Sequence, residues 1–463
     1  MEPTYVVALE IGSSKIKGIV AAADATRHVT VIAIEETDAA DCVRRGRIQN
    51  PVEVSTRVSD IIRRFENNTR LSGARISQIF VARGGRSTFS QQTSADVRLG
   101  SDMEITQSTL DKLHNEARYS LATDRDILAI SDRRFVVDGA EVKKLIGSFG
   151  NAIHGEFTIV TQAPDNLRNL DRVKIESRGS DVPRHYIPRT IAQADMMLSD
   201  SERQLGCLLI DFGAETTSIA VYREDSLQVL AVLPFGSSVI TRDLSNGMGI
   251  TIEEAEKLKI TRGVCVDRSK TTPGEGENAE IANYISSRVG EIIANIINYV
   301  EQAGFKLSDL GGGIIVTGGG TRLKGFTDML EAQAKAKVRV AVVDSTVTSP
   351  AGNSNEHLDV IALVKYALAN YANASCIELP KDATPAIPET PAYTGTRVIS
   401  EDDPKLLIDD EEEDDDELDE ELPPQAETPE KTRSNILKRL KDWFVINEEE
   451  ESELDENQDD DLK

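Results

Sequence analysis

Two stretches of the chain share one arrangement of apolar and polar positions. An apolar run of residues 6–9 ends at Glu10, and another apolar run of residues 208–210 ends at Asp211. In both places a glycine and several hydroxyl side chains follow the acidic residue, and a further apolar run comes next. This order predicts a strand, a tight turn and a second strand. One such stretch alone is typical of an ordinary hairpin, whereas two suggest duplicated halves.

The residues of both turns are chemically suited to bind phosphate. A glycine lets backbone N–H groups come close to an anion, and side-chain donors can add to them. An acidic residue at the strand end could hold a divalent cation, directly or through water. The two copies could therefore face each other across one polyphosphate. The turn residues are Gly12, Ser13, Ser14 and Lys15 in the first copy and Gly213, Thr216 and Thr217 in the second.

Helical spacing and strand-like runs alternate along the chain as far as residue 372. Asn50 and Pro51 begin a predicted helix as N-cap and first helical residue, and apolar residues then recur at helical spacing up to Phe65. Further predicted helices are 164–176, 188–198, 281–303, 322–335 and 357–371, and predicted strands include 5–11, 16–22, 76–82, 314–317 and 338–343. This alternation indicates an α/β fold.

Residues from about 86 to 165 have a pattern of their own. Thr106 can cap a helix that carries Leu110 and Leu113. Asp138-Gly139 is typical of a hairpin turn. Short strands are predicted at 127–130, 135–137, 140–142 and 157–161. We therefore expect a small α+β subdomain inserted into the first half of the chain.

Composition narrows the class of protein. The four cysteines are scattered, without a Cys-x-x-Cys or His/Cys cluster, so neither disulfides nor a zinc site is indicated. No run approaches about 18 apolar residues, the length that a membrane-spanning helix needs. The N-terminal residues lack the basic region of a signal peptide. A reducing cytoplasm is the expected location.

Negative charge is concentrated in the last part of the chain. The net charge is −27, and residues 373–463 contain 31 Asp and Glu against 9 Lys and Arg. A segment so rich in acid and proline cannot bury enough apolar surface to order itself. Residues 373–432 are therefore expected to form a disordered acidic linker, and residues 448–463 an acidic tail. No basic stripe with interleaved aromatic residues points to nucleic acid.

Between these acidic segments lies a short basic segment with one apolar face. On a helical wheel its apolar residues fall within about 120°, and its basic residues lie outside that arc. Such a helix could pack on the body, bind a groove of a partner, or lie on a membrane. Its basic residues suit anionic lipids, and its tryptophan suits the membrane interface. The apolar residues are Ile436, Leu437, Leu440, Trp443 and Phe444, and the basic residues are Lys438, Arg439 and Lys441.

Residues 316–325 add a third motif, a buried strand that ends in Thr-Gly-Gly-Gly. Together with the two hairpins, this motif resembles the actin-like ATPase superfamily. The resemblance sharpens to the FtsA family of bacterial actin-like cell-division proteins, because of the insert, the segment 255–263, and the basic helix that follows a linker. It covers residues 5–372 as the body and 433–446 as the helix.

The resemblance implies an actin-like, two-lobed, duplicated fold. In that family the insert belongs to the first lobe, and the C-terminal helix is a membrane-targeting sequence. The expected parts are a first lobe of residues 1–85 and 166–203, an insert of residues 86–165, a second lobe of residues 204–372 with a smaller subdomain at 242–310, a linker at 373–432, a membrane helix at 433–447 and a tail at 448–463.

The resemblance also implies a nucleotide site. The two hairpin turns would bind the phosphates of ATP, and Glu10 and Asp211 would lie near Mg²⁺, directly or through water. For Glu256 and Lys259 the alternative to a contact with the nucleotide is an exposed ion pair on one helix face. The residues expected near the adenosine are Gly318, Gly319, Gly320 and Leu323 in the loop and Glu256 and Lys259 on a helix.

Three residues depart from the pattern of the family. Ala214 and Glu215 stand where members usually have glycine, and both tolerate a positive φ less well than glycine does. Glu215 could repel the γ-phosphate or help to hold Mg²⁺. Glu10 replaces the commoner aspartate. We therefore expect at most weak ATP hydrolysis and assign no catalytic residue.

The resemblance implies a protein that binds ATP, polymerises in an actin-like manner and takes part in septum formation. It would tether the tubulin-like protein FtsZ, with other divisome proteins, to anionic lipids on the cytoplasmic face of the membrane at midcell. The alternatives are a small-molecule kinase or a pilus-assembly protein of the same superfamily. No acid is identified as the base that a kinase needs, and the basic C-terminal helix argues against both.

Overall fold

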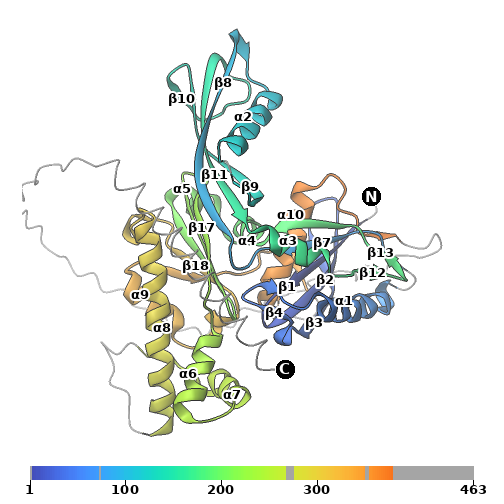
Figure 1. Ribbon diagram of the computed structural model, residues 1–463, viewed down its shortest axis with the longest axis vertical. Coiled ribbons are helices and arrows are strands. Elements are labelled where there is room, and N and C mark those ends of the chain that lie inside the picture. Colours follow the sequence, from blue (N-terminus) through green and yellow to red (C-terminus); the bar gives the residue numbers. More distant parts are fainter. Residues whose placement is uncertain (1–2, 72–73, 122, 267–275, 350–353, 379–463) are drawn as a thin grey trace, which may run out of the picture. The chain divides into compact units, whose positions relative to one another are not determined.

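The computed structural model describes residues 3–71, 74–121, 123–266, 276–349 and 354–378 (Figure 1). These residues belong to one unit that extends over residues 1–384. The predicted linker beyond residue 378, the predicted amphipathic helix at 433–447 and the predicted tail at 448–463 lie outside the described residues. Within the described residues, no helix is long and apolar enough to cross a membrane.

The first half of the chain is built on a sheet with the strand order β14-β7-β1-β2-β3-β20. The strands β1, β2 and β3 form the predicted antiparallel hairpin and its continuation. β7 pairs with β1 in parallel, and β14 pairs with β7 in parallel. The elements are β1 (Thr4–Ile11), β2 (Lys15–Ala23), β3 (Val29–Asp38), β7 (Ile79–Arg83), β14 (Arg184–Pro188), β20 (Val347–Thr348), α1 (Pro51–Glu66), α3 (Pro164–Asp171), α4 (Arg189–Met197) and α10 (Leu358–Asn370).

Helices cover both faces of this sheet. On β2, the backbone of Gly18 lies against the side chain of Phe65 from α1. Its neighbour on the strand, Lys17, forms an ion pair with Asp359 of α10. Because successive strand residues point to opposite faces, α1 and α10 lie on opposite sides of the sheet.

The start of α1 confirms the predicted N-cap. Asn50 Oδ1 accepts a hydrogen bond from the Glu53 N–H at 3.1 Å, and Pro51 is the first helical residue. Since Pro51 has no N–H, it leaves no unpaired donor in the first turn. The buried residues of the helix are Val54, Val58, Ile61, Ile62 and Phe65, the apolar face that the sequence predicts.

The last described elements pack with the first half of the chain. α10 lies in the same core as β1 and β7 and contacts α4, and β21 (Ile377–Glu378) pairs with β6 (Arg75–Ile76). Two predicted boundaries are therefore wrong: residues 358–370 are not part of the second lobe, and strand structure continues past residue 372. The chain returns because the apolar side chains of α10 are buried against the first sheet.

A second sheet has the strand order β10-β9-β11-β8-β17-β16-β15-β18-β19 (Figure 1). The strands of the insert join those of the second half where Phe89 of β8 pairs with Ala231 of β17. The insert therefore lies within the first half of the sequence but extends the sheet of the second half. The strands are β8 (Phe89–Glu104), β9 (Asp126–Val137), β10 (Ala140–Val142), β11 (Phe149–Gln162), β15 (Cys207–Phe212), β16 (Thr217–Arg223), β17 (Ser226–Leu233), β18 (Ile314–Thr317) and β19 (Val338–Val340).

The insert has a core of its own. α2 (Gln107–Ser120) contacts β8 and β11 and buries Leu113 and Ala117. A capping box at Thr106 confirms the predicted start of this helix. The two predicted strands 127–130 and 135–137 are one continuous strand, β9, because its whole backbone pairs with β11. Apolar and polar residues do not alternate regularly along β9, so the sequence pattern does not predict one long strand. Pairing with β11 stabilises the strand instead.

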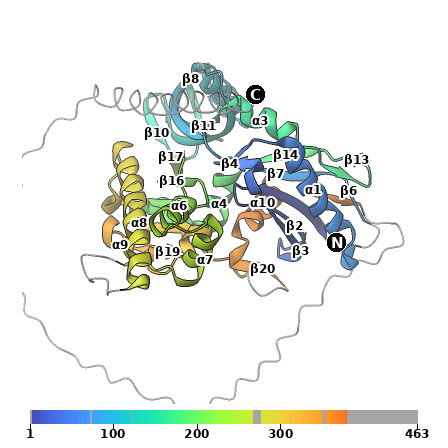
Figure 2. The ribbon, with the colours of Figure 1, turned by 60° about the horizontal axis from the view of Figure 1, so that its bottom comes forward.

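Helices of the second half pack around the long helix α8. α6 and α7 contact α8, and α9 contacts both α8 and β19 (Figure 2). Their apolar faces form one core with the strands β15, β16 and β18. The helices of this group are α6 (Ser238–Met248), α7 (Ile252–Arg262), α8 (Glu277–Gln302) and α9 (Phe326–Ala334), whereas α5 (Asp200–Leu205) contacts β16.

Two predicted helices are shorter than expected. The helix predicted at 164–176 ends at Asp171, and a two-residue strand pair, β12 (Glu176–Ser177) with β13 (Ser180–Asp181), follows. The helix predicted at 322–335 begins only at Phe326, since Gly325 has a φ of 81° that no α-helix adopts.

Candidate functional site

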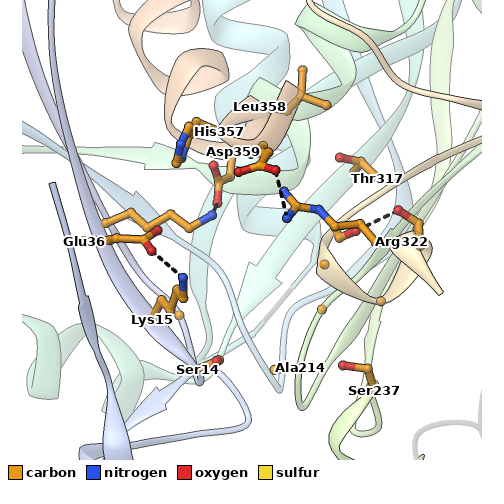
Figure 3. A pocket seen from close by; sticks show the side chains of 18 of the residues that line it. Ser14, Lys15, Glu36, Ala214, Ser237, Thr317, Arg322, His357, Leu358 and Asp359 are labelled. Carbon is orange, nitrogen blue, oxygen red and sulfur yellow. Dashed lines mark hydrogen bonds and ion pairs between the residues drawn. The ribbon is translucent and has the colours of Figure 1, made fainter. Parts of the chain in front are cut away.

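The predicted nucleotide-site residues surround one cavity of about 2310 Å³ (Figure 3). Figure 3 shows Ser14 and Lys15 on one side of this cavity, Thr317 and Arg322 on the other, and Asp359 at the start of α10 between them. Thr217 alone of the predicted set does not line it; its buried hydroxyl donates to the Phe235 carbonyl at 2.8 Å. The lining residues from the prediction are Glu10, Gly12, Ser13, Ser14, Lys15, Asp211, Gly213, Thr216, Glu256, Lys259, Gly318, Gly319, Gly320 and Leu323.

The two hairpin turns have the same geometry. The Gly12 N–H donates to the Lys15 carbonyl at 3.0 Å, and the Gly213 N–H donates to the Thr216 carbonyl at 3.0 Å. In each turn, a Cβ added to the glycine would lie 2.9 Å from that same carbonyl oxygen. A side chain there would collide with the backbone, so both turns require glycine. This equivalence supports the interpretation of the halves as duplicates.

The triple-glycine loop lies directly against the second turn. β15 and β18 run in parallel with Asp211 opposite Thr317, which brings Gly318 beside the end of β15. Gly318 has a φ of 93°, and a Cβ on it would lie 2.5 Å from Asp211 Oδ1. The glycine therefore allows a close approach between the loop and the acidic residue.

Lys259 is not part of an exposed ion pair, which was the alternative for this residue. It is only 9% exposed, and its Nζ donates to Glu256 Oε2 at 2.6 Å and to Thr241 Oγ1 at 2.8 Å. It also reaches the Ser237 carbonyl at 3.2 Å. The ammonium group therefore ties α7 to the start of α6 at the cavity wall.

Arg189 is a site residue that sequence reasoning missed. It is the first residue of α4, and its guanidinium lies between the two acidic strand ends. Nη1 donates to Glu10 Oε1 at 2.9 Å, and Nη2 lies 3.3 Å from Asp211 Oδ2. Nη2 also donates to Ser218 Oγ at 3.1 Å. The feature that could have identified Arg189 is its position, because it follows the carboxyl end of a parallel strand, and ligand sites are common at such strand ends.

Gln193, one helical turn after Arg189, also contacts Asp211. Its Nε2 donates to Asp211 Oδ2 at 3.0 Å, while its buried Oε1 has no hydrogen-bond partner in the structure. Oδ2 of Asp211 therefore interacts with both an amide and a guanidinium. The signal in the sequence was the i, i+4 spacing of two polar residues in a predicted helix.

Lys17 and Asp359 form a second buried group beside Glu10. Lys17 Nζ donates to Asp359 Oδ2 at 2.6 Å. Burial, repulsion from Asp359 and a hydrogen bond with it raise the pKa of Glu10, although Arg189 opposes this change. Burial disfavours the charge of Asp359 too, but Lys17 outweighs it and lowers the pKa of Asp359. The two carboxyl groups therefore titrate as one coupled pair.

The tip of a short hairpin contacts both turns. This hairpin consists of β4 (Val43–Arg44) and β5 (Arg47–Ile48). The N–H of Arg45 donates to Glu215 Oε2 at 2.6 Å, and the N–H of Gly46 donates to Ser13 Oγ at 2.7 Å. Consecutive amides of one chain segment therefore link the first and second turns.

The predicted strain at the second turn is absent. Neither Ala214 nor Glu215 has a positive φ, so the turn accommodates both residues without glycine. Glu215 is held by the backbone of Arg45. The expectation that these residues would fit the turn less well than glycine is not met, because neither takes a left-handed conformation there.

Glu10 and Asp211 do not fit direct coordination of Mg²⁺. Each carboxylate is already in contact with the guanidinium of Arg189, which balances part of their charge. Within the described residues, no group of three or more His, Cys, Asp and Glu side chains is arranged to hold a metal ion. Of the two predicted roles of these acids, their surroundings therefore argue against direct coordination of Mg²⁺, whereas contact with Mg²⁺ through water stays a prediction.

Two equivalent hairpins, a glycine loop and the cavity that they line define an actin-like ATPase fold. Similarity to a solved structure shows the same fold: the chain matches the structure of the "PilM-PilN type IV pilus biogenesis complex" with a TM-score of 0.54 and 14% identity, over 77% of this chain and 97% of that one. Residues 85–161 match the model of the SHS2 domain inserted in FtsA, and residues 208–356 match the model of cell division protein FtsA.

By sequence, the chain is similar to proteins of the FtsA family. It is 27% identical over 380 residues to cell division protein FtsA of Porphyromonas gingivalis, covering 78% of each chain. It is 23% identical over 407 residues to the protein of that name from Escherichia coli K12, covering 82% of this chain and 94% of the relative. A third relative of the same name, from Borreliella burgdorferi, is 26% identical over 376 residues.

Proposed function

We propose that this chain binds ATP in the cavity between its two hairpin turns, polymerises in an actin-like manner, and tethers the FtsZ ring to the cytoplasmic face of the membrane. Similarity to cell division proteins FtsA supports the role in cell division. The observation that carries the nucleotide part is the equivalence of the two turns, which place matching backbone amides and hydroxyl groups on the wall of one cavity.

The phosphates of ATP would lie between the two turns. Ser14 of the first turn and Thr216 of the second line the cavity, and Lys15 lies at its edge. These groups are donors, and Lys15 adds positive charge for an anionic chain. The adenosine would lie toward the triple-glycine loop, where Leu323 and the stem of Lys259 supply apolar wall.

Slow hydrolysis follows from the state of the acidic residues. Glu10 and Asp211 are both engaged by Arg189, and Glu215 accepts a backbone hydrogen bond. None of these carboxylates is placed to take a proton from an attacking water. We therefore expect bound ATP mainly to promote assembly of the protein on its target, rather than to be hydrolysed rapidly.

The membrane part of the proposal rests on the sequence of residues 433–447. A helix this short is marginal in water and gains its structure on contact with a surface. Liposome sedimentation tests it: the full chain should pellet with anionic vesicles, and a chain that ends at Lys431 should not. Vesicles of neutral lipid are the control for the basic residues. Equal pelleting of both chains would contradict the tether.

A substitution at Gly319 tests the nucleotide site. A Cβ on Gly319 would meet no atom within 4 Å, although the residue lines the cavity. Gly319→Leu should therefore fold normally but fill the space of the adenosine, and ATP affinity should fall by about tenfold or more. Gly319→Ala is the matched control, with a smaller loss. Equal affinity of the native chain and Gly319→Leu would exclude this site.

A further inference from the structure

Arg189 occupies the space between the two acidic residues that end β1 and β15. Its guanidinium is 2.9 Å from Glu10 and 3.3 Å from Asp211, and its side chain is 15% exposed. A hydrogen bond from Nη2 to Ser218, the residue opposite Asp211 in the second hairpin, holds the planar group in place. The guanidinium thus bridges both halves of the duplicated fold with a permanent positive charge.

The surroundings of Asp211 leave little room for a metal ion. Oδ2 interacts with Arg189 and with the amide of Gln193, and Oδ1 lies against the backbone of Gly318. Oε1 of Glu10 is likewise bonded to Arg189. A divalent cation at this point would have to displace the guanidinium, or lie beside it and be repelled by it.

We propose that Arg189 takes the place of a divalent cation between Glu10 and Asp211, so that this chain binds the polyphosphate of ATP without requiring Mg²⁺. This inference rests on the proposed function for its nucleotide. A guanidinium is itself suited to phosphate oxygens, because it offers several donors in one plane. The N–H on its Nε is buried without a hydrogen-bond partner in the structure. The protein therefore carries its own counter-charge for the ligand.

The first experiment measures ATP affinity in the presence of Mg²⁺ and in the presence of EDTA. For the native chain, the two affinities should agree within about threefold. Arg189→Lys keeps a cation and should behave in the same way. Arg189→Met frees both carboxylates, and its affinity should then become at least about tenfold higher with Mg²⁺ than with EDTA. A native chain that loses tenfold or more in EDTA would overturn the proposal.

The second experiment uses metal alone and does not depend on nucleotide. Mn²⁺ is titrated into each chain, and free Mn²⁺ is followed by electron paramagnetic resonance. The native chain should show no site here, Arg189→Met should gain one, and Arg189→Met with Asp211→Asn should lose it again. A site in the native chain that Asp211→Asn removes would contradict the proposal, even if no chain binds ATP.

Stability of the variants needs its own control, since Arg189→Met leaves two buried carboxylates unpaired. If that chain does not fold, Arg189→Met combined with Glu10→Gln removes one of the charges and keeps Asp211 as a metal ligand. Its Mn²⁺ titration then replaces that of the single variant. Failure of ATP to bind in all chains and conditions would disprove the proposed function, whereas the Mn²⁺ result still decides the role of Arg189.

Discussion

The carboxylate of Glu215 accepts a hydrogen bond of 2.6 Å from the backbone N–H of Arg45. These residues lie in different halves of the chain, and the next amide, that of Gly46, donates to Ser13. The carbonyl of Arg45 in turn accepts from the N–H of Arg86, at the start of the insert. One hairpin tip therefore connects both turns that are proposed to bind phosphate with the insert.

Two substitutions at Glu215 separate its charge from its hydrogen bond. Glu215→Gln keeps an acceptor for Arg45 but removes a negative charge near the phosphates, so ATP affinity should rise by about threefold to tenfold with little change in stability. Glu215→Ala loses the bond as well, and the free energy of unfolding should fall by about 1–3 kcal/mol. Nucleotide titration and urea unfolding measure the two effects.

Glu301→Ala, on the exposed surface of α8, is the control for a general effect of removing a carboxylate. The role assigned to Glu215 fails if both of its variants behave like this control. Phosphate release from the Glu215 variants, measured in parallel, shows whether this residue also restrains hydrolysis.

Gly85 should be intolerant of any side chain. It has a φ of 96°, and a Cβ on it would lie 2.4 Å from the carbonyl oxygen of Gly46. Gly85→Ala should lower the free energy of unfolding by more than about 2 kcal/mol, because it combines backbone strain with a collision. Gly139→Ala is a matched control with a φ of 85° and open space around the added Cβ. If thermal unfolding shows equal losses of stability for Gly85→Ala and Gly139→Ala, backbone strain alone explains the loss at Gly85 and the collision with Gly46 adds nothing.

Lys259 should be essential to the wall of the cavity. Lys259→Met removes a buried ammonium that serves three acceptors, so the free energy of unfolding should fall by about 2–3 kcal/mol and ATP affinity should also fall. Lys112→Met changes an exposed lysine of α2 that does not line the cavity, and serves as the control. If nucleotide titration gives equal affinities for both variants, Lys259 has no part in binding.

The pair of Glu202 and Arg339 predicts a dependence of stability on pH. Although burial opposes ionisation, Arg339 and the N–H of Ser199 hold the pKa of Glu202 at about 2. In an unfolded chain this pKa is about 4.3. The stabilisation is therefore present above about pH 5 and is lost as the pH falls toward 2.

Because Arg339 is 40% exposed, solvent screening reduces the effect to about 1 kcal/mol. Glu202→Gln should lose that amount at pH 7 and differ little from the native chain at pH 2. Urea unfolding at both pH values measures the difference. A constant difference between the chains would contradict the assignment.

Local pattern predicted much of the site. The two hairpins, the triple-glycine strand end and the N-cap of α1 depend on residues close in sequence, since side-chain alternation and turn chemistry act over a few positions. Arg189 could not be placed in this way, because it meets Glu10 only where β14 lies two strands away from β1 in the first sheet.

Sequence alone determined the α/β class, the duplicated turns, the place of the insert and the acidic composition after residue 372. Tertiary structure decided that α10 returns to the first core, that β8 of the insert joins β17, and that Arg189 stands between two carboxylates. These features depend on contacts between segments far apart in the chain. Burial of apolar surface selects such contacts, and it is a property of the whole packed molecule rather than of any short stretch.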